Sequence, residues 1–115
     1  MKPTTRRAIA CIAGRLAGAN ASGVYDYSES RHVNFSGGVS ATNVNVYDHD
    51  AGCQISGDGS SLYHYGNSSH LQLDMSGPRF NGYDCDTGSH FSGDVSGSAV
   101  SLYDYGESSY FNYSL

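Results

Sequence analysis

A tyrosine followed by aspartate or histidine returns five times along the chain in a similar local context. The five copies are centred on Tyr25, Tyr47, Tyr63, Tyr83 and Tyr103, which lie 22, 16, 20 and 20 residues apart. An internal repeat of this length indicates an architecture built from similar units that lie side by side. We therefore expect a fold made of five structural units, each of about 20 residues.

Each unit contains two short stretches in which apolar and polar residues alternate, and this alternation is typical of β-strands. The first stretch surrounds the tyrosine. The second surrounds an apolar residue eight positions later, which is Val33, Ile55, Leu71, Phe91 or Phe111. Polar segments rich in glycine and serine separate the stretches, as expected of turns. The unit is therefore strand, turn, strand, turn, with boundaries near 22–41, 42–59, 60–78, 79–98 and 99–115.

Two all-β folds fit such a unit. In a short β-solenoid each unit is one coil, and equivalent positions stack along an axis. In an antiparallel meander each unit is a hairpin, and the sheet closes into a barrel. Because the columns keep their residue type, we favour the β-solenoid and keep the barrel as the alternative. The 16-residue spacing between Tyr47 and Tyr63 counts against a strictly regular coil.

Residues 1–21 precede the repeat domain at 22–115 and differ from it in composition. We expect an amphipathic helix that acts as a cap or arm covering one end of the stack. Its apolar face would carry Ile9, Ile12, Ala13 and Leu16, and its opposite face Arg7, Cys11 and Arg15. The alternative is an export signal, because Arg6 and Arg7 precede an apolar stretch and Ala19-Asn20-Ala21 has the small-residue cleavage form.

Charge is unevenly divided between the two parts. Residues 1–20 contain four basic residues and no acidic one, whereas residues 21–115 contain all eleven acidic residues and only Arg31 and Arg79 as basic ones. An acidic body disfavours nucleic acid as a partner, and no apolar run is long enough for a membrane span. The basic segment could attract the acidic body of a neighbouring copy.

The favoured function is that of a structural, self-assembling protein. If the units stack as coils, the stretch from Tyr110 to Leu115 forms an open edge with unpaired backbone groups. Such an edge can pair with another copy, and a contact that does not close gives a filament or homo-oligomer. The predicted interface contains the repeated tyrosines, the last stretch and the basic segment: Tyr25, Tyr47, Tyr63, Tyr83, Tyr103, Tyr110, Phe111, Tyr113, Leu115, Arg6, Arg7 and Arg15.

The alternative function is a small extracellular or cell-surface module that binds Ca²⁺ or carbohydrate. Units two and four share the pattern D-x-D-x-G, in which Asp48, Asp50, Asp84 and Asp86 offer the oxygen ligands that Ca²⁺ prefers. The alternation does not decide whether the repeated tyrosines face the core or solvent. A tyrosine ladder on the outside would be a contact surface for protein or sugar.

We do not expect an enzyme. Asp26 and His32, like Asp84 and His90, flank the turn of their unit and could face each other as acid and base. Serines are abundant throughout the chain, and none stands apart as a nucleophile beside them. The three cysteines lack the spacing of a metal site.

Overall fold

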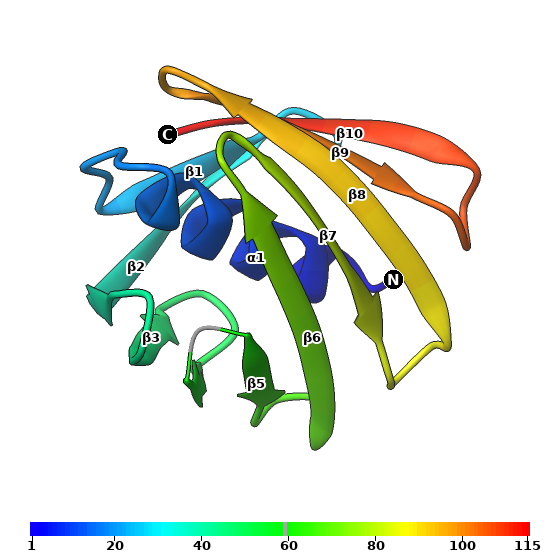
Figure 1. Cartoon of the computed structure of the whole chain (residues 1–115), viewed down its shortest axis with the longest axis horizontal. Coiled ribbons are helices and arrows are strands. Elements are labelled where there is room, and N and C mark those ends of the chain that lie inside the picture. Colours follow the sequence, from blue (N-terminus) through cyan, green and yellow to red (C-terminus); the bar gives the residue numbers. More distant parts are fainter. Residues whose placement is uncertain (59) are drawn as a thin grey trace.

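The computed structural model describes residues 1–58 and 60–115, which form one helix and ten strands (Figure 1). The elements in chain order are α1 (Pro3–Leu16), β1 (Gly23–Asp26), β2 (Arg31–Val39), β3 (Val44–Asp48), β4 (Cys53–Gly57), β5 (Ser61–His64), β6 (Ser69–Ser76), β7 (Arg79–Asp84), β8 (Ser89–Ser96), β9 (Ala99–Asp104) and β10 (Ser109–Ser114). The two strands of each repeat unit form one antiparallel hairpin.

The ten strands form a closed antiparallel barrel in which every strand pairs with its neighbours in the chain and β10 pairs with β1. The prediction of a β-solenoid is therefore wrong, and the antiparallel barrel is the correct alternative. The prediction of an open C-terminal edge is wrong for the same reason, because β10 is paired with β9 on one side and with β1 on the other. Side-chain alternation is the same in both folds, so it could not distinguish them.

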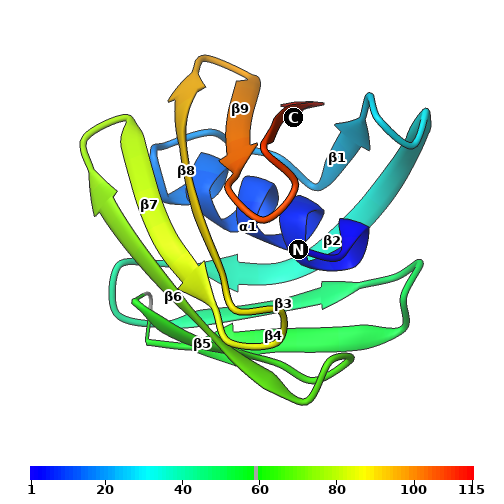
Figure 2. The same ribbon diagram turned by 90° about the vertical axis from the view of Figure 1, so that its right-hand side faces the viewer.

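The N-terminal helix is confirmed, but it does not cap the end of a stack. Figure 2 shows α1 enclosed by the ring of strands, and residues Thr5 to Gly14 are all buried. A barrel of about eight strands is filled by its own side chains, and wider ones have room for a central helix. Small residues let the helix fit this space: Ala8, Ala10, Cys11, Ala13 and Gly14 are buried on several sides of it.

The strands present one face to the helix and the other to solvent. The apolar column of the sequence points inward, since Val33, Ile55, Leu71 and Phe91 are buried and Phe111 is half-buried. The repeated tyrosines occupy the opposite face of the strands and are half-buried or exposed. This arrangement answers the question that the alternation left open: the tyrosines lie on the outer wall of the barrel.

The turn inside each hairpin places its fifth residue after the tyrosine in the left-handed region. The φ angles are 52° at Ser30, 67° at Gly52, 52° at Ser68, 69° at Gly88 and 55° at Ser108. Glycine adopts this conformation without steric cost, whereas a residue with a Cβ does not. Units one, three and five therefore carry a strained serine where units two and four carry glycine.

Replacing Ser68 by glycine is expected to raise the free energy of unfolding by about 0.5–1 kcal/mol, because it removes the Cβ strain at positive φ. Gly88→Ser should lower it by a similar amount. Urea unfolding followed by circular dichroism measures both changes. Ser69→Gly is the matched control, because Ser69 lies in β6 and is not among the residues with positive φ. An equal loss of stability in Ser68→Gly and Ser69→Gly would contradict the role of the turn.

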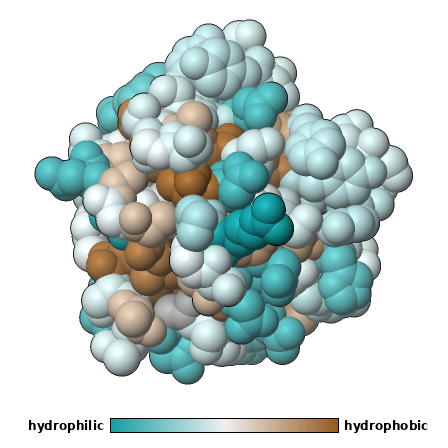
Figure 3. All heavy atoms as spheres, turned by 45° about the horizontal axis from the view of Figure 1, so that its top comes forward, coloured by the Kyte–Doolittle hydropathy of each residue, from teal (hydrophilic) through white to brown (hydrophobic). Residues whose placement is uncertain are grey.

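The surface is mainly polar. Figure 3 shows one face of the molecule, where apolar atoms lie in separate areas between white and teal side chains. The exposed large side chains of apolar character are tyrosines: Tyr27, Tyr47, Tyr65, Tyr105 and Tyr110. Within the described part of the chain, the helix is too short and too polar to cross a membrane.

Candidate functional site

The residue after each repeated tyrosine points into the barrel, where the five copies form an inner polar ring. Asp26, Asp48, Asp84 and Asp104 are completely buried, and His64 occupies the fifth position. A buried carboxylate requires hydrogen bonds and a compensating charge. Each ring residue receives a backbone N–H from its own turn, for example from Asp86 to Asp84 Oδ1 and from Gly106 to Asp104 Oδ1, both at 2.9 Å.

Cations from the N-terminal segment supply this charge for Asp48 and Asp104. Arg7 Nε donates to Asp48 Oδ2 at 2.9 Å, and the Met1 ammonium group donates to Asp104 Oδ2 at the same distance. Arg6 Nη1 lies 3.3 Å from Asp104 Oδ2, and the Arg6 guanidinium stacks 3.7 Å above the ring centre of Phe111. The basic segment and the aspartate column, which looked independent in the sequence, thus hold the helix inside the barrel.

His64 occupies the position of the aspartate in the ring and forms a hydrogen bond within the hairpin turn of unit three. Its Nδ1 accepts the N–H of Asn67 at 3.3 Å, and the Asn67 amide donates to Thr5 Oγ1 on the helix. Burial lowers the pKa of His64, and the charges of Asp48 and Asp84 oppose this effect only in part. The neutral imidazole is therefore the form that the folded barrel favours.

His64 should make the protein less stable in weak acid. Since its pKa is lower in the folded than in the unfolded chain, where it is about 6.5, its contribution is fully present above that value. That contribution is lost as the pH falls through about 6.5 toward the folded pKa. Urea unfolding at pH 7.5 and pH 5.5 tests this, with His64→Gln as the non-titrating comparison. Between pH 7.5 and pH 5.5, the free energy of unfolding should fall less in His64→Gln than in the wild-type protein. An equal fall in both proteins would contradict the role of His64.

Three of the four predicted calcium ligands pair with cations of the chain itself, and the fourth, Asp84, accepts a hydroxyl group. Asp48 pairs with Arg7 inside the barrel, and Asp50 pairs with Arg7 and Arg31 at the rim. Asp84 Oδ2 accepts the hydroxyl of Thr87 at 2.9 Å, and Asp86 lies 3.1 Å from the Lys2 ammonium. Across the described residues, no three histidine, cysteine or acidic side chains are arranged to hold a metal ion. The calcium prediction gains no support from this arrangement.

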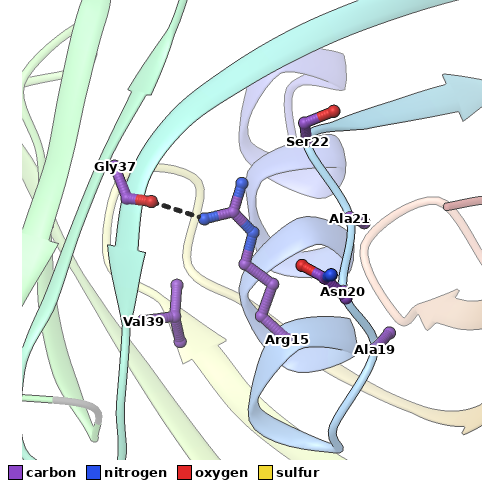
Figure 4. Close-up of a pocket in the computed structure, with 7 residues that line it drawn as sticks. All are labelled: Arg15, Ala19, Asn20, Ala21, Ser22, Gly37 and Val39. Atoms are coloured by element: carbon purple, nitrogen blue, oxygen red, sulfur yellow. Dashed lines mark hydrogen bonds between the residues drawn. The ribbon is translucent and has the colours of Figure 1, made fainter.

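Arg15 fills a notch beside β2. Its guanidinium donates to the carbonyl oxygens of Gly37 at 2.8 Å and Phe35 at 3.3 Å, which β1 does not reach (Figure 4). The surrounding hollow of about 490 Å³ is lined by the segment Ala19–Ser22 and by Val39. Arg15 therefore satisfies backbone acceptors at a gap in the barrel wall.

The interior offers no activated nucleophile among the groups whose pKa is shifted. Burial raises the pKa of the Cys11 thiol to about 11 and also raises that of Cys53, so both stay protonated near neutral pH. The predicted facing of Asp26 with His32 and of Asp84 with His90 is wrong. Each aspartate is buried inside, whereas His32 and His90 are exposed on the outer wall opposite Tyr25 and Tyr83.

The outer wall carries a cluster of aromatic rings on every hairpin. In unit five, Tyr103 lies 4.8 Å from Tyr105 and 4.7 Å from Tyr110, measured between ring centroids, in edge-to-face geometry. In unit three, Tyr63 has the same relation to Tyr65 and His70. The other units have one such pair each: Tyr25 with Tyr27, Tyr47 with His49, and Tyr83 with His90.

Beside the unit-five cluster lies an open depression, here called the Tyr103 groove. It consists of two adjoining hollows of about 380 and 400 Å³ that share Asn81 and Ser92. Tyr103 and Tyr110 line the first hollow, and Tyr105 and His90 line the second. Arg79, Asp94 and Ser101 add further polar groups to the first. The groove thus combines exposed aromatic rings with both donors and acceptors of hydrogen bonds.

The predicted interface residues separate into two groups. Arg6, Arg7 and Tyr113 are buried inside the barrel, Arg15 is bound to β2, and Phe111 and Leu115 are partly buried. The repeated tyrosines and Tyr110 lie on the outer wall. Sequence reasoning missed Arg79, Asn81, Ser92 and Asp94, because they reach the tyrosines only through the lateral register of β7, β8 and β9. The one signal available in the sequence was the alternation, which places these residues on the outward face of their strands, like the repeated tyrosines.

Comparison with known proteins gave no match to a family, to a curated sequence or to a solved structure. Function is therefore inferred from the chain's own geometry and chemistry.

Proposed function

We propose that this protein is a carbohydrate-binding module whose binding site is the Tyr103 groove. The observation that carries the proposal is the row of Tyr103, Tyr105 and Tyr110 beside the polar side chains of β7 and β8. Tyr110 is 69% exposed and Tyr105 is 57% exposed. Exposed aromatic surface bordered by polar groups is typical of a binding site.

A sugar ring matches this chemistry on both counts. Its C–H groups form an apolar face that can lie on a tyrosine ring, and its hydroxyl groups need hydrogen-bond partners around the edge. Asp94 accepts hydrogen bonds, Arg79 donates them, and Asn81 does both. Among the described residues Arg79 forms no ion pair, so its guanidinium remains available to a ligand.

The remaining features favour a neutral oligosaccharide. The acidic body, with nine more acidic than basic residues between 21 and 115, repels polyanions such as nucleic acids. The helix occupies the barrel interior, which removes the enclosed cavity that barrels of this kind offer to small apolar ligands. The site that remains is an open groove on the outer wall, whose shape suits one or two sugar units of a longer chain.

Binding of linear oligosaccharides of glucose, xylose, mannose and N-acetylglucosamine to the immobilised protein tests the proposal. At least one of them should bind, and Tyr110→Ala should weaken the binding at the Tyr103 groove about tenfold or more, as for loss of one well-packed aromatic contact. Tyr27→Ala is the matched control, because Tyr27 is 60% exposed and lies in unit one. The proposal fails if none of these sugars binds, or if both variants lose the same affinity.

A further inference from the structure

The repeat places a second site of the same kind on another part of the wall. We infer that Tyr63, Tyr65 and His70, together with Asn45 and Ser56, form a second carbohydrate site, so that the protein is bivalent and cross-links glycans. This inference rests on the proposed function and specifies how many sites the barrel presents and what kind of ligand arrangement it recognises.

The first observation is the lateral register of the outer wall. Around the Tyr103 groove, Asn81 pairs with Ser92, Ser92 with Tyr103, and Tyr103 with Tyr110 across four neighbouring strands. On β3 to β6 the same order recurs, because Asn45 pairs with Ser56, Ser56 with Tyr63, and Tyr63 with His70. Each row therefore presents asparagine, serine, tyrosine and a second ring in the same order across four neighbouring strands.

The other units break this row. Next to Tyr83 the register brings Gln72 and then Ser61, and next to Tyr25 it brings Ser114 and then Ala99. The complete row thus occurs at the junction of units two and three and at the junction of units four and five.

The aromatic geometry of the two sites also agrees. Tyr63 lies 4.8 Å from Tyr65 with an interplanar angle of 74°, and Tyr103 lies 4.8 Å from Tyr105 at 76°. The second contact is 4.9 Å at 73° from Tyr63 to His70, against 4.7 Å at 67° from Tyr103 to Tyr110. Tyr65 is 54% exposed, close to the 57% of Tyr105. A ligand that stacks on one cluster therefore meets a similar arrangement of rings on the other, with His70 in the place of Tyr110.

The backbone beneath the two rows matches as well. Gly57 and Gly93 hold equivalent positions opposite Leu62 and Leu102. A Cβ at Gly57 would collide with the carbonyl oxygen of Ser61, and one at Gly93 with that of Ser101. The same close approach also occurs at Gly37 and Gly82, so it belongs to the barrel wall as a whole.

The placement of the sites makes the protein a cross-linker. The first row spans β7 to β10 and the second spans β3 to β6, so they share no strand of the ten-strand ring. Their centres lie four strands apart in this ring of ten, on different parts of the outer wall of a body about 30 Å wide. A short oligosaccharide bound at one row does not reach the other, so the two sites bind separate chains.

Calorimetric titration with the oligosaccharide that binds in the array counts the sites. The wild-type protein should bind two equivalents. Tyr110→Ala and Tyr65→Ala should each bind one, and the double variant none within the same concentration range. Light scattering with the same sugar coupled to albumin should rise with the wild-type protein and stay low with either single variant.

The two proposals fail in different ways. A stoichiometry of one that Tyr65→Ala leaves unchanged would overturn the second site and leave the Tyr103 groove intact. Absence of any binding by the wild-type protein would overturn the proposed function itself. Circular dichroism of each variant shows whether the barrel is folded, and the exposure of Tyr65 and Tyr110 makes folding of both variants the expected result.

Discussion

Replacement of Arg7 by leucine is expected to lower the free energy of unfolding by about 3–5 kcal/mol. Arg7 and Asp48 are both buried, and Arg7 Nε donates to Asp48 Oδ2 at 2.9 Å. Removing the guanidinium leaves the Asp48 carboxylate inside the barrel without its compensating charge. Breaking one partner of a buried pair costs far more than the pair contributes, because the remaining charge keeps its desolvation penalty. Urea unfolding of the purified variants measures the loss.

Two further variants separate this effect from a loss of packing. Arg7→Leu combined with Asp48→Asn should recover a large part of the stability, since it removes the uncompensated charge while the asparagine amide oxygen can still accept the N–H groups of the turn. Arg31→Leu is the matched control, because Arg31 pairs with Asp50 at the exposed rim, where an ion pair contributes about 1 kcal/mol or less. Equal losses in Arg7→Leu and Arg31→Leu would contradict a buried electrostatic anchor.

Gly93→Val is expected to cost about 3 kcal/mol or more, because the barrel wall has no room for a side chain at this position. A Cβ at Gly93 would lie 2.5 Å from Phe80 Cζ and would also collide with the carbonyl oxygen of Ser101. Phe80 faces Gly93 across the β7–β8 ladder, and Phe91 faces Gly82 in the same way, so each ring occupies the space above a glycine. Both phenylalanines belong to the buried core, so a side chain at Gly93 displaces core packing.

Gly38→Val is the control for Gly93→Val. Gly38 also lies in a strand, but a Cβ there meets no atom within 4 Å. Its substitution should change the free energy of unfolding by about 0.5 kcal/mol or less, as for other exposed positions. Thermal unfolding compares the two variants directly. Equal melting temperatures of Gly93→Val and Gly38→Val would show that the wall is less tightly packed than the structure indicates.

The sequence predicted the repeat unit well and its assembly poorly. The alternation around Tyr63 and Leu71 is enough to predict two strands, a polar turn and opposite faces for the two residues. It contains no information on what lies next to each hairpin, since coils and antiparallel neighbours use the same alternation. A column of constant residue type, such as the repeated aspartate, favours stacking, although a barrel around one central helix has an equal reason to repeat it.

The helix shows the same limit. Ile9, Ile12 and Leu16 form an apolar stripe, which predicts a helix with one buried side. The structure buries Arg6 and Arg7 as well, because Asp48 and Asp104 reach them from strands 41 and 98 residues away in the chain. Only the match between the cations of the first seven residues and the inward column of acids indicated this arrangement.

The candidate site was recognised in part. The tyrosine column was visible as a surface for sugar or protein, but its polar neighbours were not. Asn81 and Ser92 lie 22 and 11 residues before Tyr103, and only the pairing of β7, β8 and β9 brings them into one row. Lateral neighbours of this kind depend on strand register, which local sequence patterns determine weakly where turns differ in length.

Titration of protein labelled at the tyrosine rings with the binding oligosaccharide, followed by nuclear magnetic resonance, tests the central claim most directly. The signals of Tyr103, Tyr105 and Tyr110 should shift with saturation, together with those of Tyr63 and Tyr65, whereas buried Tyr113 and exposed Tyr27 should stay unchanged. Shifts confined to Tyr25, Tyr27 and Tyr47, or no shift with any sugar tested, would contradict the assignment of the outer tyrosine rows as carbohydrate sites.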